Sequence, residues 1–213
     1  DGKKTLKKNN KTYKKISDHL GFLPVVIISP TDRDLIAEGS STRRKFLDSI
    51  IGQTHKSYVQ NLVHYQRTLS QRNALLKQYK LQGSYDPETL EVYNEQLIGF
   101  GEPIFQKRKA FVEAFLPYFL KRYAGISGSK EKVNIVYESQ LHQNTFDALL
   151  KESNERDRIL QHTAVGPHKD DLSFHIDGYP IKKYGMDLLS LMSLSLATRG
   201  CIVTLRFICT TSI

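Results

Sequence analysis

The 213-residue sequence has no tryptophan and only two cysteines and two methionines. Two cysteines exclude the disulfide-rich scaffolds of small secreted domains. No apolar run reaches the ~18 residues that a membrane-spanning helix needs, so we expect no membrane partner and a cytoplasmic location. A hydrophobic content of 39% with 25% charged residues is ordinary for a globular chain, which excludes disorder throughout.

Complete catalytic signatures are also lacking. The sequence has no Gly-x-x-x-x-Gly-Lys-Ser/Thr phosphate loop, no Gly-x-Ser-x-Gly elbow, no Cys-x-x-Cys pair and no His-Glu-x-x-His zinc motif. We therefore assign no catalytic, cofactor-binding or metal-binding residue from motifs.

Positive charge is in excess, with 31 Lys and Arg against 22 Asp and Glu, which favours a polyanionic partner. Much of the excess lies in seven N-terminal lysines: Lys3, Lys4, Lys7, Lys8, Lys11, Lys14 and Lys15. Leu6 and Tyr13 flank the turn-prone pair Asn9-Asn10, so this segment predicts a β-hairpin. Its lysines either protect a solvated edge strand or contact phosphates.

Two long helical patterns follow a short buried strand. Residues 23–30 form an apolar, β-branched run, which predicts a strand of an α/β sheet. Residues 42–82 then show apolar positions at a mean spacing of about 3.5, typical of one long helix with a coiled-coil-like seam. Asp86-Pro87 supplies an N-cap and a first helical residue for a second helix.

The second helix should reach about Tyr123 and pack antiparallel to the first as a helical arm. We expect Pro103 and Pro117 to kink or interrupt it. Alternating apolar residues over 133–137 predict a strand after the arm.

The rest of the pattern predicts a helix and a hairpin. Asn144 can cap a helix that runs toward Ile159. Residues 172–184 alternate around Asp177-Gly178, which predicts a β-hairpin with a tight turn.

Arg43 and Arg44 stand at the start of the first long helix, where cations oppose the helix dipole. We expect an internal ion pair with Asp32, Asp34 or Glu38 in preference to a bound phosphate, because these acids are adjacent in sequence.

Two further polar groups are candidate sites. His162, His168, Asp170 and Asp171 either bind a divalent metal and act in acid–base chemistry or satisfy backbone groups at a tight Gly-Pro turn. We favour the turn, because spacing fixes no third ligand. The polar segment 71–73 interrupts the helical seam, and register setting in a coiled coil explains it.

Four motifs occur in a recognisable order. They are Pro30-x-Asp32 with Gly39 and Arg43-Arg44-x-Phe46-Leu47-Asp48, then Gln71-Arg72-Asn73, then Glu155-Arg156-Asp157, then Gly166-Pro167-His168-Lys169-Asp170-Asp171. In this order, over residues 1–185, they resemble the RecF family of bacterial DNA replication and repair proteins.

The resemblance implies an α/β fold: a partial ABC-type ATPase head, P-loop NTPase-like and related to Rad50 and SMC heads, with an inserted antiparallel helical arm. It assigns residues 1–41 to the first lobe, with the Lys-rich hairpin and the buried strand, 42–162 to the arm and its return segment, and 163–185 to a hairpin of the second lobe. Family members bind ATP and Mg between the heads of a homodimer on DNA. They act with RecO and RecR in replication, recombinational gap repair and the SOS response.

The resemblance also implies DNA as a partner, both single-stranded and gapped duplex. The residues that we expect to contact DNA are Lys3, Lys4, Lys7, Lys8, Arg43 and Arg44. The residues that carry the family motifs are Pro30, Asp32, Gly39, Arg43, Arg44, Phe46, Asp48, Gly166, Pro167, His168, Asp170 and Asp171.

The sequence departs from the family at both ends. The family's phosphate loop would precede residue 1, and no Ser-x-Gly-Gln signature or Walker B segment follows Gly185. Residues 186–213 hold both methionines and both cysteines, so we expect a foreign tail, produced by a frameshift near Gly185. The full-length family is a weak DNA-stimulated ATPase, whereas we expect this segment alone to hold no ATP or Mg and to be inactive.

Two other functions stay open from the residues. One is a non-enzymatic coiled-coil adaptor that binds protein through the arm. The other is a metal-dependent phosphohydrolase that uses His168, Asp170 and Asp171.

Overall fold

The computed structural model describes residues 5, 7–8, 10–12, 35, 38–128 and 131–181. The predicted strand over 23–30 and the tail over 186–213 lie outside the described residues. So do other residues that the sequence singled out: Lys3, Lys4, Leu6, Asn9, Tyr13, Lys14, Lys15, Pro30, Asp32 and Asp34.

The predicted N-terminal hairpin is confirmed. Strands β1 (Lys7–Lys8) and β2 (Lys11–Thr12) pair antiparallel, with Lys7 opposite Thr12. Asn10 in the turn has a φ of 62°, a left-handed conformation that asparagine tolerates better than most residues. Lys7 and Lys11 are exposed.

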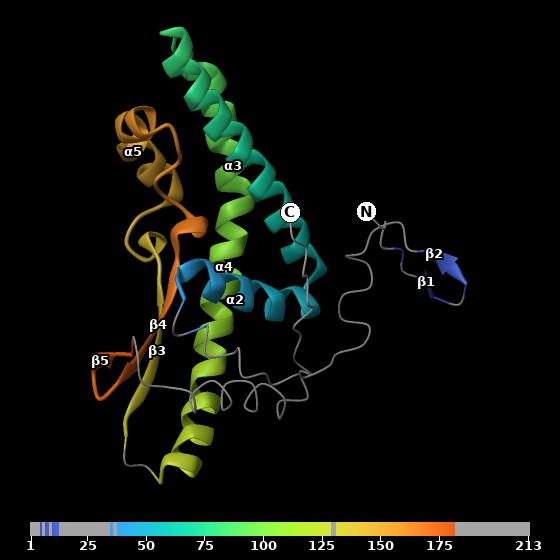
Figure 1. The fold of residues 1–213 in the computed structure, drawn as a ribbon, viewed down its shortest axis with the longest axis vertical. Coiled ribbons are helices and arrows are strands. Elements are labelled where there is room, and N and C mark those ends of the chain that lie inside the picture. The colour runs from blue at the N-terminus through green and yellow to red at the C-terminus, as the bar shows by residue number, and fades with distance from the viewer. Residues whose placement is uncertain are drawn as a thin grey trace.

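The first long helix is broken, so the prediction of one continuous helix over 42–82 is wrong. Helix α2 (Ser40–Thr54) ends at His55, whose φ of −131° and ψ of 93° are extended, and α3 (Lys56–Gln82) begins immediately after it. The break lets α2 turn across α4 while α3 follows α4 (Figure 1). Leu47, Ile50 and Ile51 of α2 are buried in the core.

Helix α4 (Pro87–Ser127) begins as predicted, because the Asp86 carboxylate accepts hydrogen bonds from the N–H groups of Glu88 and Thr89. It packs antiparallel to α3. The helix continues through Pro103 and Pro117, so the expected interruption does not occur. Both prolines lie on exposed positions of the helix, where water can hydrate the carbonyl groups that they leave unbonded.

The chain returns from the arm through a small antiparallel sheet and a helix. The elements are β3 (Val133–Glu138), the 3-10 helix η3 (Gln140–His142), α5 (Phe146–Leu160), the 3-10 helix η4 (Pro167–Lys169), β4 (Asp171–Ile176) and β5 (Tyr179–Pro180). The strand order is β3-β4-β5, with Glu138 opposite Asp171. Asp177 and Gly178 have φ values of 50° and 85°, which confirms the predicted tight turn.

Helix α5 has a different cap from the predicted one. The side chain of Thr145, and not that of Asn144, accepts the hydrogen bond from the N–H of Ala148. Thr145 therefore ends the loop, and the helix begins at Phe146.

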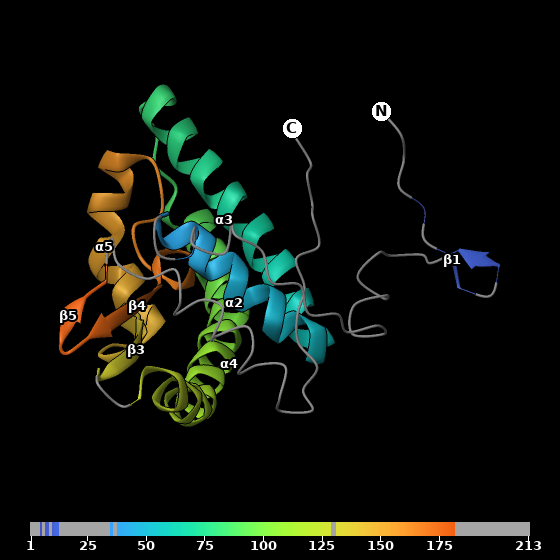
Figure 2. The same ribbon diagram turned by 60° about the horizontal axis from the view of Figure 1, so that its bottom comes forward.

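The core lies between the arm and the returning elements. In two views, α5 and the sheet lie on one side of α4 and the N-terminal half of α3 lies on the other (Figure 1, Figure 2). Val133, Ile135 and Tyr137 point inward from β3, as their alternation predicted. Phe146 is fully buried and lies against Gly101 of α4. Within the described part of the chain, no helix is both long and apolar enough to cross a bilayer.

Candidate functional site

Four arginines from three helices contact the segment over residues 163–171, which we call the return loop. They are Arg43 and Arg44 of α2, Arg72 of α3 and Arg108 of α4. The return loop joins α5 to β4, so this cluster connects the beginning of the arm, both of its helices and the sheet.

Arg43 forms a two-pronged ion pair with Asp171. Its Nε and Nη2 donate to the two carboxylate oxygens over 2.6 Å and 2.8 Å, and Nη1 donates to the main-chain oxygens of Leu35 and Glu38. The hydrogen bond with Asp171 raises the pKa of Arg43. An internal carboxylate partner was predicted, but it lies 128 residues away along the chain. The Glu38 carboxylate binds Thr42 instead.

Arg44 and Arg108 bind the last part of the return loop. Arg44 donates to the main-chain oxygen of Asp170 over 2.6 Å, and burial lowers its pKa. Arg108 donates to the Asp48 carboxylate over 2.9 Å and to the main-chain oxygen of Pro167 over 2.7 Å. Burial alone would lower the pKa of Arg108, but the surrounding negative groups, Asp48 first, raise it.

Arg72 is fully buried and bonds three elements. Its Nη1 donates to the Asp157 carboxylate over 2.7 Å and to the Thr163 hydroxyl over 2.8 Å, and its Nε donates to Asn94 over 2.8 Å. Asn73 accepts from both the N–H and the hydroxyl of Thr163. Register setting within a two-helix coiled coil therefore does not account for residues 71–73, because two of them bind the return loop and α5.

The side chain of His168 is satisfied inside the protein. Its Nε2 lies 3.0 Å from the main-chain oxygen of Thr163, and its Nδ1 lies 2.7 Å from the hydroxyl of Tyr65. A neutral ring with the proton on Nε2 satisfies both contacts. Burial lowers the pKa of His168 to about 4, which fits this form.

Asp170 is also held internally. Its carboxylate accepts from the hydroxyl of Tyr137 and lies 3.4 Å from Nη1 of Arg108, and burial raises its pKa. The described residues contain no group of three metal-ligating side chains. With His168, Asp170 and Asp171 all bonded to the chain itself, the arrangement supports the predicted structural turn and gives the phosphohydrolase hypothesis no ligands.

Gly166 is required by the geometry of the return loop. Its φ is 117°, and an added Cβ would lie 2.6 Å from Phe146 and 2.8 Å from the Tyr65 hydroxyl. The glycine of the fourth motif therefore lets the loop pass close to two core rings.

The remaining motif residues have structural positions. Gly39 is the N-cap of α2 and, having no side chain, cannot accept a hydrogen bond from the first turn. Phe46 packs against the core. The guanidinium groups of Arg43 and Arg44 are bonded to the chain itself, so their contact with DNA stays a prediction.

The sequence reasoning missed Arg108, Tyr65 and Tyr137. Arg108 follows Ile104 by four residues and precedes Val112 by four, so a charge stands on the apolar stripe of α4. That misplaced charge was the available signal, because a buried cation requires a buried partner. The two tyrosines gave no such signal, since buried aromatic residues are ordinary.

The arginines that contact the return loop beside the sheet are not free to hold a triphosphate. A triphosphate needs free cations or N–H groups to neutralise it. The three arginines beside the sheet, Arg43, Arg44 and Arg108, are bonded to carboxylates and carbonyls of the chain.

Comparison with known proteins gives one consistent result. The chain is 55% identical over 183 residues to a DNA replication and repair protein RecF of Flavobacterium johnsoniae, which covers 86% of this chain and 51% of that protein. It is 43% identical to the RecF of Phocaeicola vulgatus over 86% of this chain and 48% of that protein. No family model matches the chain.

Solved structures agree in fold. The chain superposes on the recombination mediator protein RecF with ATP in the RecFOR pathway with a TM-score of 0.83 and 32% identity, over 91% of this chain and 55% of that one. The predicted fold class, a partial ATPase head of the α/β type with an inserted helical arm, is confirmed by this match. The chain spans about half the length of the curated relatives that it matches, and over the matched residues it belongs to the RecF family.

Proposed function

We propose that the chain supplies the arm and part of the head of an ATP-dependent DNA-binding protein of replication, recombinational gap repair and the SOS response. In this proposal residues 1–41 belong to the first lobe, 42–162 to the arm and its return, and 163–185 to the second lobe. The complete protein acts in the cytoplasm as an ATP- and Mg-dependent homodimer on gapped DNA, together with RecO and RecR.

One observation carries the proposal: the Arg43–Asp171 ion pair joins the start of the arm to the first residue of β4. An arm that leaves a head and comes back to it must bring these two points together. The similarity to RecF with ATP supports the same arrangement.

DNA binding is tested by salt titration of the whole chain on a labelled gapped duplex. Each phosphate that a lysine neutralises adds about 0.9 to the slope of log affinity against log salt. Exchange of the hairpin lysines Lys7, Lys8 and Lys11 for Gln should therefore lower the slope by up to about 2.7. Lys151→Gln is the control, because Lys151 is paired with Asp147. Binding that is absent, or that does not weaken with salt, contradicts the proposal.

A further inference from the structure

Helix α3 has one outward face that runs its full length and carries no negative charge. The face consists of residues spaced alternately by four and three, all of them exposed: Lys56, Gln60, Val63, Arg67, Ser70, Ala74, Lys77 and Leu81. We call it the outer α3 face. The sequence contains no acidic residue between Asp48 and Asp86, so none lies on α3 at all.

The rest of the arm is different. Exposed acids occur on both neighbouring helices: Glu88, Glu91, Glu95, Glu102 and Glu113 on α4, and Glu152 and Glu155 on α5. A surface that only keeps a helix in solution carries charges of both signs. The outer α3 face lacks that mixture, which indicates an anionic partner.

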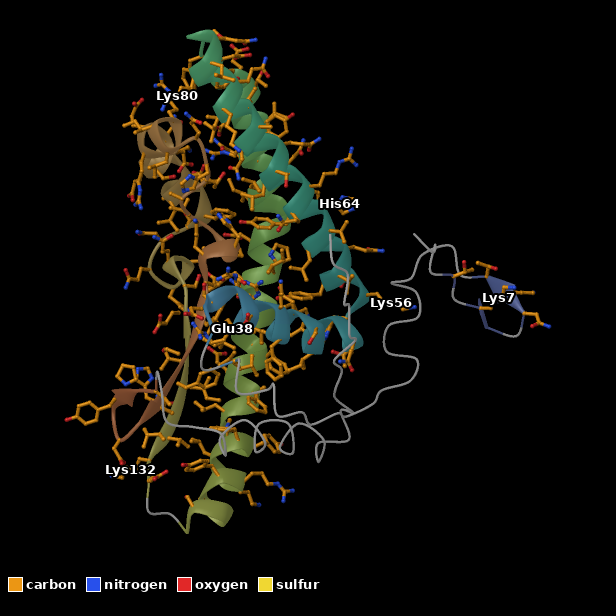
Figure 3. The ribbon with its side chains drawn as sticks, in the orientation of Figure 1. Lys7, Glu38, Lys56, His64, Lys80 and Lys132 are labelled. Carbon is orange, nitrogen blue, oxygen red and sulfur yellow. The ribbon has the colours of Figure 1, made fainter. Side chains whose placement is uncertain are left out.

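The cations of this face form no ion pair within the part of the chain that the structure describes. The cations that form ion pairs among the described residues are Arg43, Arg72, Arg108, Lys151 and Arg158. Carboxylates neutralise both of the buried ones, Arg72 and Arg108. Lys56, Arg67 and Lys77 take part in none of these ion pairs. In Figure 3, Lys56 and His64 lie on the side of α3 away from α5 and the sheet.

The spacing of the three cations fits duplex DNA. At 1.5 Å per residue, Lys56 and Arg67 are separated by about 16 Å along the helix, and Arg67 and Lys77 by about 15 Å. A helix that lies along a duplex passes one of its two phosphate backbones every ~17 Å on average, because both strands cross the same side once in each turn of about 34 Å. At about 100° per residue, the three side chains fall within about 80° of the helix circumference.

Polar donors extend the same face toward α4. A hollow of about 470 Å³ between the two helices is lined by His64, Arg67, Gln71, Tyr93, Gln96 and Phe100. The ring of His64 stacks on Phe100 with centroids 5.1 Å apart, which holds an imidazole at the rim. Such groups commonly bind sugar and phosphate oxygens.

We propose that the outer α3 face is a docking surface for the backbone of duplex DNA, which lies along the arm and is contacted by Lys56, Arg67 and Lys77. The inference rests on the proposed function and assigns it a surface. These contacts are to phosphates and so carry no sequence preference.

The test compares two triple variants of the whole chain that lose the same charge. One is Lys56→Gln with Arg67→Gln and Lys77→Gln; the control is Lys107→Gln with Lys121→Gln and Lys132→Gln, exposed cations off this face. On duplex DNA, the α3 triple variant should show a slope of log affinity against log salt that is smaller by about 2.7. At about 0.1 M salt this corresponds to roughly eightfold weaker binding for each cation removed. The control should lose less than about one slope unit. Circular dichroism checks that both variants keep their helices.

Each outcome decides the inference. If the wild-type chain binds DNA and the α3 triple variant binds equally well, or if both triple variants lose the same affinity, the outer α3 face is not the docking surface while the proposed function stands. If the wild-type chain shows no salt-dependent binding, both proposals are overturned. A single strand of the same length should be affected less than the duplex, and an equal loss contradicts alignment along a duplex.

Discussion

Replacement of Arg72 by Met should destabilise the chain strongly, because it removes one member of a fully buried ion pair. Arg72 and Asp157 are both 0% exposed, and the substitution leaves the carboxylate with only the N–H of Ala164 and the hydroxyl of Ser153. Breaking a buried pair in this way costs about 3–5 kcal/mol. For a chain of this length that corresponds to a fall in melting temperature of roughly 6–20 °C. Urea unfolding followed by circular dichroism measures the change.

A second variant separates the ion pair from general loss of packing. Asp157→Asn together with Arg72→Met removes both charges, so the double variant should be less destabilised than the sum of the two single variants by at least about 1 kcal/mol. Arg72→Lys keeps a charge but lacks the fork that reaches Asn94 and Asp157 together, and it should lie between wild type and Arg72→Met. A loss below about 1 kcal/mol for Arg72→Met, or strict additivity in the double variant, refutes the reasoning.

Other predictions concern the return loop. Gly166→Ala should lower the free energy of unfolding by about 2–4 kcal/mol, because the new Cβ would meet Phe146 and Tyr65 and alanine is strained at a φ of 117°. Gly39→Ala is the control, because nothing lies within 4 Å of a Cβ added there. Equal unfolding midpoints for the two variants would contradict this account. The pKa of about 4 for His168 lies below the ordinary 6.5, so the unfolded chain takes up the proton first. The stability from neutral His168 is complete above pH 6.5 and is lost as the pH falls toward 4; NMR should show the ring titrating near the lower value, and a titration near 6.5 contradicts its burial.

Local features were predictable where a few adjacent residues determine them. The Asp86 cap, the Asp177-Gly178 turn and the alternation of β3 depend on backbone geometry within four or five residues, and the structure confirms them. The cap of α5 was placed one residue early, because Asn144 and Thr145 are both good capping residues and only the bond to Ala148 decides between them.

Tertiary partners were not predictable in the same way. The break at His55 has no proline to mark it, and the nearest glycine, Gly52, lies three residues earlier inside α2. The break places the apolar side of α2 against the core. Proximity in sequence suggested Asp32, Asp34 or Glu38 as the partner of Arg43, whereas the fold supplies Asp171. Arg72 was recognised as an interruption of an apolar seam, but its acid lies on a helix that no local pattern places beside it.

The central claim is that the start of the arm and the return loop meet beside the sheet through Arg43 and Asp171. A double-mutant cycle with Arg43→Met and Asp171→Asn, measured by urea unfolding of the whole chain, tests it most directly. Because the pair is two-pronged and only partly exposed, the account predicts a coupling energy of about 1 kcal/mol between residues 128 positions apart. A coupling energy of zero, with the two single variants strictly additive, would contradict it.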